Sequence, residues 1–302
     1  METGIFFWLQ LLSVHIIQCI NFIFPIKRKS LHQKNVIITG AAGGIGRELA
    51  LSFGRHGCRL FLIDLHPEGL QKLKGDLNGC GISADVYAVN LSDQQAVKGL
   101  AERLKREVGH IHCVVSNAGA ADNYGIANMD RDSLKSSFRS NFYSAVNVIE
   151  EFLPTMIAQD EGHILSVCSI AALVPQPGLL AYSASKSALT AYMTSLRQEL
   201  KLKGSFVKTT IVYPGMTKTP MTEGICIDTP GSSYILPHEV AGAVLDAVLC
   251  EKEEIVIPKR LFFFHRVLQL LPTTVRDALV YYLFSYTKTY ARNHGYDKYK
   301  IC

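Results

Sequence analysis

Three side chains that could carry out acid–base chemistry together lie between Ser169 and Lys186. Tyr182 precedes Lys186 by four positions, and apolar residues recur around them at helical spacing, so a helix would place both one turn apart on one face. A positive charge beside a phenol favours the phenolate, and we expect the pKa of Tyr182 to fall below its ordinary value of about 10. The hydroxyl of Ser169 could hold the reacting oxygen. This group predicts proton transfer at a substrate oxygen, although Tyr-x-x-x-Lys also occurs on ordinary amphipathic helices.

A glycine-rich turn near the start of the chain is typical of a phosphate-binding loop. Thr39-Gly40-Ala41-Ala42-Gly43-Gly44-Ile45-Gly46 follows the apolar run 36–38 and precedes the helix-like stretch 47–56. Glycines let the backbone approach a pyrophosphate closely, and a helix N-terminus offers free N–H groups and the positive end of its dipole. Asp64 closes the next apolar run, where an acid can meet the ribose of a dinucleotide. Together these features predict a dinucleotide site, which a glycine turn alone would not.

With further elements downstream, the sequence resembles the short-chain dehydrogenase/reductase family from about residue 34 to residue 258. Asn117-Ala118-Gly119 matches the family's Asn-Ala-Gly element, and the stretch from Pro214 to Thr219 matches its Pro-Gly-x-x-x-Thr. The resemblance implies a catalytic set and a cofactor site. The catalytic set is Asn141, Ser169, Tyr182 and Lys186, and the cofactor site is Gly40, Gly44, Ile45, Gly46, Asp64, Asn90, Asn117, Tyr182, Lys186, Pro214, Gly215, Thr217 and Thr219.

The resemblance also assigns a role to each catalytic side chain. Tyr182 would take the hydroxyl proton of an alcohol while a hydride leaves to a nicotinamide. Lys186 would lower the pKa of the tyrosine and hold the cofactor ribose. Ser169 would orient the substrate oxygen, and Asn141 would hold a water for proton relay.

Two positions depart from the family pattern, and one acid indicates the cofactor. Ser116 stands where an asparagine is common, and Asn90 stands where an aspartate often meets the adenine. Both replacements keep hydrogen-bonding capacity, so we expect altered cofactor affinity and not loss of function. Asp64 would accept hydrogen bonds from the ribose and repel a 2′-phosphate, while Leu65 and His66 supply no arginine or lysine. We therefore expect NAD, with NADP as the second choice.

The arrangement of apolar segments predicts an α/β fold with a doubly wound, Rossmann-type parallel sheet in a single catalytic domain. The chain has 302 residues, of which 48% are hydrophobic, enough for one large core. Short β-branched runs alternate with helix-length amphipathic stretches, which is typical of parallel strands joined by crossover helices. The candidate site residues follow or close these runs, so they should share one edge of the sheet. The predicted strands are 36–39, 59–63, 85–89, 111–116, 163–167, 207–212 and 254–257.

The cysteine pattern indicates free thiols. The chain has eight cysteines, scattered without a Cys-x-x-Cys pair or a ligand-spaced cluster. This pattern argues against a disulfide framework and against a metal site. A reducing compartment is the expected environment.

The first 29 residues are predicted to be a hydrophobic anchor. The stretch from Gly4 to Ile26 has no charge and is followed by Lys27-Arg28-Lys29. As a helix it would span about 34 Å, enough for a hydrocarbon core of about 30 Å. The basic flank should stay cytosolic, which puts the catalytic domain (30–258) on the cytosolic side. The hydrophobic N-terminus resembles that of family members found at the endoplasmic reticulum membrane or on lipid droplets, so the resemblance implies one of these two locations. Polar residues along the stretch leave an interfacial helix or a hairpin as alternatives.

Two later segments are expected to serve the substrate and the membrane. The irregular, apolar stretch 216–236 is typical of a substrate loop or lid. The segment 259–302 interleaves aromatic runs with eight lysines and arginines and only two acids. That composition suits an anionic membrane surface better than nucleic acid, because no nucleic-acid motif accompanies it. The alternative is that its helices complete the core or a dimer contact.

The function predicted from these features is oxidation of a lipophilic alcohol at a membrane. The overall plan resembles the membrane-bound branch of the family that oxidises retinol and hydroxysteroids, so retinoids or steroids come first and fatty alcohols next. We expect a homodimer. The alternatives are a catalytically silent lipid-surface scaffold and an NADPH-dependent carbonyl reductase. The residues expected to line an apolar pocket are Leu173, Val174, Pro175, Leu179, Met216, Met221 and Ile225.

Overall fold

The computed structural model describes residues 28–121, 130–223 and 234–284, the last four of them by backbone alone. The chain separates into a unit Met1–Ser30 and a unit Leu31–Cys302. The described strands and helices all belong to the second unit. Within the described ranges no helix combines the length and the apolar character needed to cross a membrane, and the predicted anchor from Gly4 to Ile26 lies outside them.

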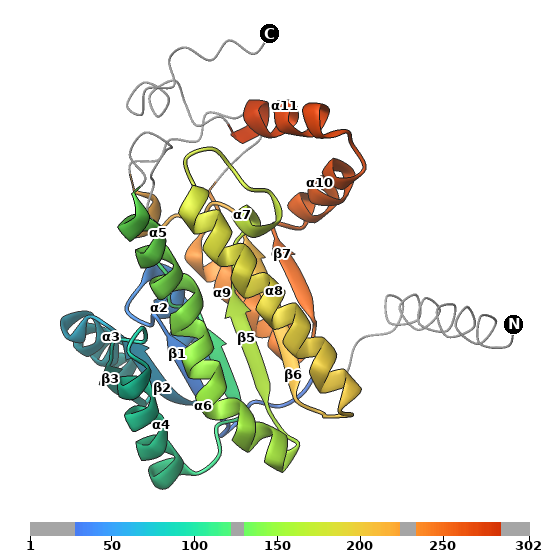
Figure 1. The fold of residues 1–302 in the computed structure, drawn as a ribbon. Coiled ribbons are helices and arrows are strands. Elements are labelled where there is room, and N and C mark those ends of the chain that lie inside the picture. Colours follow the sequence, from blue (N-terminus) through green and yellow to red (C-terminus); the bar gives the residue numbers. More distant parts are fainter. Residues whose placement is uncertain (1–27, 122–129, 224–233, 285–302) are drawn as a thin grey trace, which may run out of the picture. The chain divides into compact units, whose positions relative to one another are not determined.

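Seven parallel strands form one sheet in the order β3-β2-β1-β4-β5-β6-β7 (Figure 1). This confirms the predicted doubly wound α/β fold, and every predicted strand is present, with ends that move by at most two residues. The strands are β1 (Asn35–Thr39), β2 (Arg59–Asp64), β3 (Ala84–Ala88), β4 (Cys113–Ser116), β5 (His163–Val167), β6 (Lys208–Pro214) and β7 (Glu254–Ile257).

Helices cover both faces of the sheet, because successive strand residues point to opposite sides and both sides are apolar. In β1, Ile37 belongs to one hydrophobic core, whereas Val36 and Ile38 belong to the other, and none of the three is exposed. The first core contains residues of α4 (Gln94–Val108), α6 (Ser144–Gln159) and α8 (Leu180–Leu202). The second contains residues of α2 (Gly44–Arg55), α3 (Pro67–Gly79) and α9 (Pro237–Leu249). The remaining helical segments are α5 (Arg131–Phe138), a π-helical turn (Arg139–Tyr143), α7 (Ile170–Leu173), a 3-10 turn (Pro220–Thr222), α10 (Lys259–Gln269) and α11 (Thr273–Phe284).

The sheet reverses its winding direction beside β1, and this reversal opens the site. From β1 the chain adds β2 and β3 on one side and then returns to add β4 on the other. Connections on the two sides diverge at the carboxyl ends of the strands, which is where open α/β sheets bind ligands. A crevice is therefore expected above the ends of β1 and β4.

Thr39, the last residue of β1, ties the two sides of this crevice together. Its hydroxyl oxygen accepts the backbone N–H groups of Asn117 and Ala118, both at 3.0 Å. The side-chain amide of Asn117 donates in return to the carbonyl oxygens of Thr39, at 3.0 Å, and Gly40, at 3.1 Å. The segment that follows β4 is thereby held against the glycine turn that follows β1.

The two C-terminal helices extend over the carboxyl end of β7 (Figure 1). Leu268 of α10 and Val280 of α11 are buried in the first core, which agrees with the alternative that these helices complete the core. Other apolar side chains of the same pair stay exposed, namely Phe263 (69%), Val267 (55%) and Leu270 (85%). The helices therefore have an inner face that packs and an outer apolar face.

Replacing Thr39 with valine tests the contribution of its hydrogen bonds across the crevice. The shape of the side chain is kept, but two backbone N–H groups lose their acceptor, so the free energy of unfolding should fall by about 2–3 kcal/mol in urea denaturation. Thr209→Val is the matched control, because Thr209 is also a buried strand threonine but its hydroxyl has no hydrogen-bond partner among the described residues. The control should lie within about 0.5 kcal/mol of the native protein. Equal losses in the two variants would contradict this role of Thr39.

Candidate functional site

A single cavity of about 910 Å³ runs along the carboxyl edge of the sheet and contains nearly all of the predicted site. Asn141 is the exception, since it is fully buried and does not line the cavity. Every other residue of the predicted catalytic and cofactor sets does, namely Gly40, Gly44, Ile45, Gly46, Asp64, Asn90, Asn117, Ser169, Tyr182, Lys186, Pro214, Gly215, Thr217 and Thr219.

The glycine turn forms a cradle that side chains would fill. Gly40 has a φ of +63°, which favours glycine, and a Cβ on Gly46 would collide with the carbonyl oxygen of Gly40. A Cβ on Gly44 would lie 2.8 Å from Cγ2 of Thr219. These glycines bring bare backbone to the start of α2, where free N–H groups can meet a pyrophosphate. The residues present therefore fit a dinucleotide.

Asp64 is fixed at the far end of the cradle by backbone donors. One carboxylate oxygen accepts the N–H of Ala42 at 2.9 Å, and the other accepts the N–H of His66 at 3.0 Å. Each oxygen keeps a further lone pair for a ribose hydroxyl. Arg47, which directly follows the glycine turn, pairs with Asp76 at 2.7 Å and does not line the cavity.

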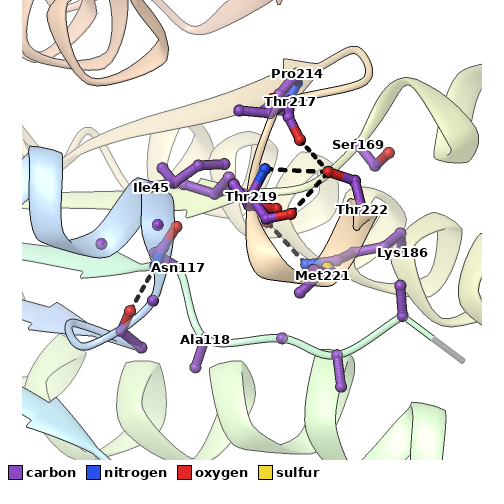
Figure 2. A pocket seen from close by; sticks show the side chains of 18 of the residues that line it. Ile45, Asn117, Ala118, Ser169, Lys186, Pro214, Thr217, Thr219, Met221 and Thr222 are labelled. Carbon is purple, nitrogen blue, oxygen red and sulfur yellow. Dashed lines mark hydrogen bonds between the residues drawn. The ribbon is translucent and has the colours of Figure 1, made fainter. Parts of the chain in front are cut away.

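The segment after β6 closes the other side of the cradle through three threonines (Figure 2). The hydroxyl of Thr222 lies 2.6 Å from the carbonyl oxygen of Thr217 and 3.0 Å from that of Thr219, and it accepts the N–H of Thr219 at 3.1 Å. This arrangement holds the Thr219 side chain against Gly44. Sequence analysis had not assigned a role to Thr222, although the short polar run around it is typical of a turn.

Tyr182 and Lys186 lie one turn apart on α8, as their spacing predicts, and both line the cavity. Lys186 is 3% exposed, and its Nζ donates to the carbonyl oxygen of Val167 at 2.9 Å. Ser169 follows β5 and caps α7 by accepting the N–H of Ala171 at 3.1 Å. The strand end and the helix thus bring together the hydroxyl, the phenol and the ammonium group.

The expected lowering of the Tyr182 pKa is wrong for this structure. Burial raises the pKa of the phenol to about 12, and a hydrogen bond from the Ser169 hydroxyl opposes that rise. Burial also lowers the pKa of Lys186. Both shifts have the same cause, because a site without water disfavours whichever form is charged. The phenol is therefore protonated at neutral pH and is ready to donate a proton.

Asn141 lies behind the cavity in a π-helical turn, a feature that often marks functional sites. Its side-chain amide donates to the carbonyl oxygen of Ala120 at 2.9 Å and to Oγ of Ser185 at 3.1 Å. Its side-chain oxygen accepts the N–H of Ala120 at 2.9 Å, and Ser185 donates to the carbonyl oxygen of Tyr182 at 2.8 Å. Both amide donors are engaged, so the side chain acts as a clamp between the Asn117–Ala121 segment and α8. The predicted water relay stays a prediction.

The walls beyond the catalytic group differ from those predicted. Leu173, Val174 and Pro175 do not line the cavity, because α7 turns Val174 into the first core and leaves Pro175 exposed. Leu179, Met216 and Met221 do line it, and Ile225 lies outside the described residues. The side chains that sequence analysis missed are Gln176, Ile235, Arg260, Leu261 and Phe264.

The predicted substrate loop is held at its base. The N–H of Ile235 donates to the carbonyl oxygen of Met216, and the N–H of Lys218 donates to that of Ile235, both at 2.9 Å. These bonds form a short parallel bridge between Thr217 and Ile235. The tip of the loop, residues 224–233, lies outside the described part of the chain.

At the opposite, amino-terminal edge of the sheet, His110, His112 and Glu161 bring potential metal-ligand atoms within 4.8 Å of one another. The backbone N–H of Asn35 donates to Nδ1 of His112 at 3.1 Å, so in the neutral ring the proton is on Nε2 and that nitrogen has no free lone pair. Glu161 already forms an ion pair with Lys34, whose Nζ lies 2.7 Å from the carboxylate oxygen Oε1. Within the described residues, His112 and Glu161 thus have partners of their own, whereas both ring nitrogens of His110 are buried without a hydrogen-bond partner.

The match to a known family covers the cradle and the catalytic side chains together. The family model described as short chain dehydrogenase matches residues 34–228. The chain belongs to this family. It is accordingly an oxidoreductase that acts on alcohol or carbonyl groups and uses a nicotinamide dinucleotide.

Two human proteins and one solved structure illustrate the relationship. The chain is 34% identical to epidermal retinol dehydrogenase 2 of Homo sapiens, over 83% of this chain and 82% of that protein. It is 30% identical to estradiol 17-beta-dehydrogenase 11 of Homo sapiens, over 84% of each chain. A short chain dehydrogenase/reductase from Burkholderia phymatum, solved in complex with NAD, shares the fold with a TM-score of 0.74 and 21% identity, over 80% of this chain and 95% of that one.

Removing the Ser169 hydroxyl should move the pH dependence of alcohol oxidation upward. We expect oxidation to require the phenolate of Tyr182, and the Ser169 hydrogen bond lowers the pKa of this group. In Ser169→Ala the pKa should rise further, so kcat/KM for oxidation at neutral pH should fall by about tenfold or more and the alkaline rise should begin at higher pH.

Ser183→Ala is the matched control, because Ser183 adjoins Tyr182 and is buried, but its hydroxyl has no hydrogen-bond partner in the part of the chain that the structure describes. Its pH profile should coincide with that of the native enzyme. If the pH profile of kcat/KM in Ser169→Ala had the same midpoint as that of the native enzyme, the assigned role of Ser169 would be refuted.

Proposed function

We propose that this chain is a membrane-attached dehydrogenase that oxidises a lipophilic alcohol, with NAD as the hydride acceptor. The observation that carries the proposal is the meeting of Ser169, Tyr182 and Lys186 with the glycine cradle in one cavity. Proton transfer and dinucleotide binding are thus available at the same place. Retinoids and hydroxysteroids are the first substrate classes, and fatty alcohols are the next.

The chain's own residues would handle the proton of this reaction. The hydroxyl of Ser169 orients the alcohol oxygen, and the phenolate of Tyr182 removes its proton as the carbonyl forms. A bound nicotinamide supplies the redox chemistry by accepting the hydride. The buried ammonium of Lys186 favours the phenolate once it forms, since opposite charges attract strongly in a dry site. In the reverse direction the protonated phenol donates to a carbonyl oxygen.

The walls of the cavity support a lipophilic substrate. The side chains beyond the catalytic group are mostly apolar, among them Leu179, Met216, Met221, Leu261 and Phe264. Each methylene of a ligand buried against them contributes about 0.8 kcal/mol. The names of the two human relatives, a retinol dehydrogenase and an estradiol dehydrogenase, agree with such substrates.

NAD is proposed over NADP because of the charge at the ribose end of the cradle. The carboxylate of Asp64 is held at that end by the N–H groups of Ala42 and His66. A 2′-phosphate there would meet a like charge without a compensating arginine or lysine among the cavity residues at that end. Fluorescence titration should give a dissociation constant for NADPH at least about tenfold above that for NADH. In Asp64→Ser the ratio of the NADPH to the NADH dissociation constant should be smaller. Tighter binding of NADPH than of NADH by the native protein would refute the choice of NAD.

Membrane attachment is proposed from both ends of the chain. The uncharged stretch from Gly4 to Ile26 ends in a basic cluster, and the outer face of α10 carries Phe263, Val267 and Leu270 beside Arg266. Apolar side chains next to cations suit an anionic lipid surface. The proposed location is the cytosolic face of the endoplasmic reticulum or a lipid droplet. A chain lacking residues 1–29 and 285–302 should sediment less with phospholipid vesicles than the full chain, and equal sedimentation would contradict the proposal.

Replacing Tyr182 with phenylalanine tests the catalytic assignment. Loss of the group that exchanges the proton should lower kcat by at least about a thousandfold with retinol, hydroxysteroids and fatty alcohols, while NADH binding measured by fluorescence is kept. Tyr192→Phe is the control, since Tyr192 is on the same helix but packs against Phe142 outside the cavity. Full activity in Tyr182→Phe would refute the proposed role of Tyr182 in proton transfer. No turnover of any such alcohol by the native protein would instead favour a lipid-surface scaffold.

A further inference from the structure

The cavity wall contains one basic side chain whose role is not explained by cofactor binding or proton transfer. The charged residues or histidines of the wall are Asp64 and His66 at the ribose end, Lys186 beside Tyr182, and Arg260 in the first turn of α10. Lys186 donates to the carbonyl oxygen of Val167. Arg260 has no hydrogen bond and no ion pair within the part of the chain that the structure describes.

The position of Arg260 excludes the 2′-phosphate of a cofactor as its partner. Leu261, the next residue, approaches Gly215 so closely that a Cβ there would lie 2.9 Å from its Cδ1. The start of α10 is therefore beside the end of β6, whereas Asp64 ends β2. Three strands separate β2 from β6 in the sheet, which corresponds to roughly 19 Å at the usual strand spacing. Arg260 belongs to the substrate side of the cavity.

The surroundings of Arg260 indicate what this guanidinium could bind. Its neighbours in the wall, Leu261, Phe264 and Ile235, are apolar, and they suit the body of a lipid. A guanidinium stays charged at all relevant pH values and presents a planar set of donors that matches a carboxylate or a sulfate. Arg260 is exposed at the cavity wall, so its guanidinium is accessible to a ligand, and an anionic group placed there would gain a charge-assisted partner that a neutral lipid alcohol lacks.

We propose that the substrate is a lipid alcohol that bears an anionic group, a carboxylate or a sulfate, away from its reacting hydroxyl, and that Arg260 binds this group. This inference rests on the proposed function and narrows its substrate class. The hydroxyl is held at Ser169 and Tyr182 at one end, while the acid group is held at α10. Among lipid alcohols of one skeleton, those with an acid group should be preferred.

Matched pairs of substrates test the preference. We would compare an ω-hydroxy fatty acid with the fatty alcohol of equal length, and a hydroxysteroid sulfate with the free steroid, in neutral detergent micelles. The native enzyme should show the higher kcat/KM for the anionic member of each pair. In Arg260→Gln the ratio of anionic to neutral kcat/KM should fall roughly three- to tenfold. Arg260→Lys should keep part of the preference, because it keeps the charge but not the planar fork.

Arg266→Gln is the matched control for charge on the same helix. Arg266 is exposed, lies 5.1 Å from the ring centre of Phe262 and does not line the cavity. Its substrate ratio should equal that of the native enzyme. If Arg260 instead served the phosphates of a membrane, both variants would lose binding to anionic vesicles to the same extent and neither would change the substrate ratio. That result would overturn the proposal.

Two binding measurements separate this inference from its alternatives. NADH affinity should be the same in Arg260→Gln and the native protein, and a marked loss would assign Arg260 to the cofactor and overturn the inference. A fluorescent polyene fatty acid should bind the enzyme–NADH complex more tightly than the corresponding polyene alcohol, and Arg260→Gln should remove the difference. This second measurement needs no turnover, so it decides the role of Arg260 even if the proposed dehydrogenase activity fails. Equal binding of acid and alcohol by the native protein would refute the inference.

Discussion

The site depends first on the hydrogen bonds that Thr39 makes across the crevice at the ends of β1 and β4. A doubly wound sheet diverges at this point, so its two sides have no strand pairing above the last residues of β1 and β4 to hold them in register. The Thr39 hydroxyl supplies that connection by accepting two N–H groups from the segment after β4. Gly40 follows in the left-handed conformation, and its carbonyl oxygen accepts a hydrogen bond from the side-chain amide of Asn117.

A second constraint comes from burial of the catalytic pair. Lys186 is buried and Tyr182 is half-buried at the cavity wall, and burial raises the pKa of the phenol and lowers that of the ammonium, which favours the neutral form of each. A site with few fixed charges is sensitive to any charge that a ligand brings, because the local dielectric constant is low. The protein therefore holds a protonated phenol as its resting acid. The hydrogen bond from the Ser169 hydroxyl acts against this state, and in the proposed mechanism the ammonium of Lys186 does so as well.

The sequence was sufficient for features that depend on local patterns. Short β-branched runs located all of the strands, and the residues that close them located the cavity, because parallel strands align their carboxyl ends. The pKa of Tyr182 could not be obtained in this way, since spacing along a helix places Lys186 near the phenol but says nothing about how much water reaches either group. The prediction for Val174 failed for a related reason. An apolar residue close to Ser169 in the sequence can face either the cavity or the core, and the turn of α7 places Val174 in the core.

The cavity residues that were not predicted lie in a different part of the chain from the predicted catalytic residues. Ser169, Tyr182, Lys186 and the glycine cradle all lie within residues 34–228, the region that the family model matches. Arg260, Leu261 and Phe264 reach the same cavity from α10, outside that region. The helix α10 contacts β7 and places Leu268 in the first core, so its position is fixed by packing while its first residues line the cavity. The proposed proton-transfer group thus lies within the region shared with the family, whereas part of the wall on the proposed substrate side comes from α10, outside that region.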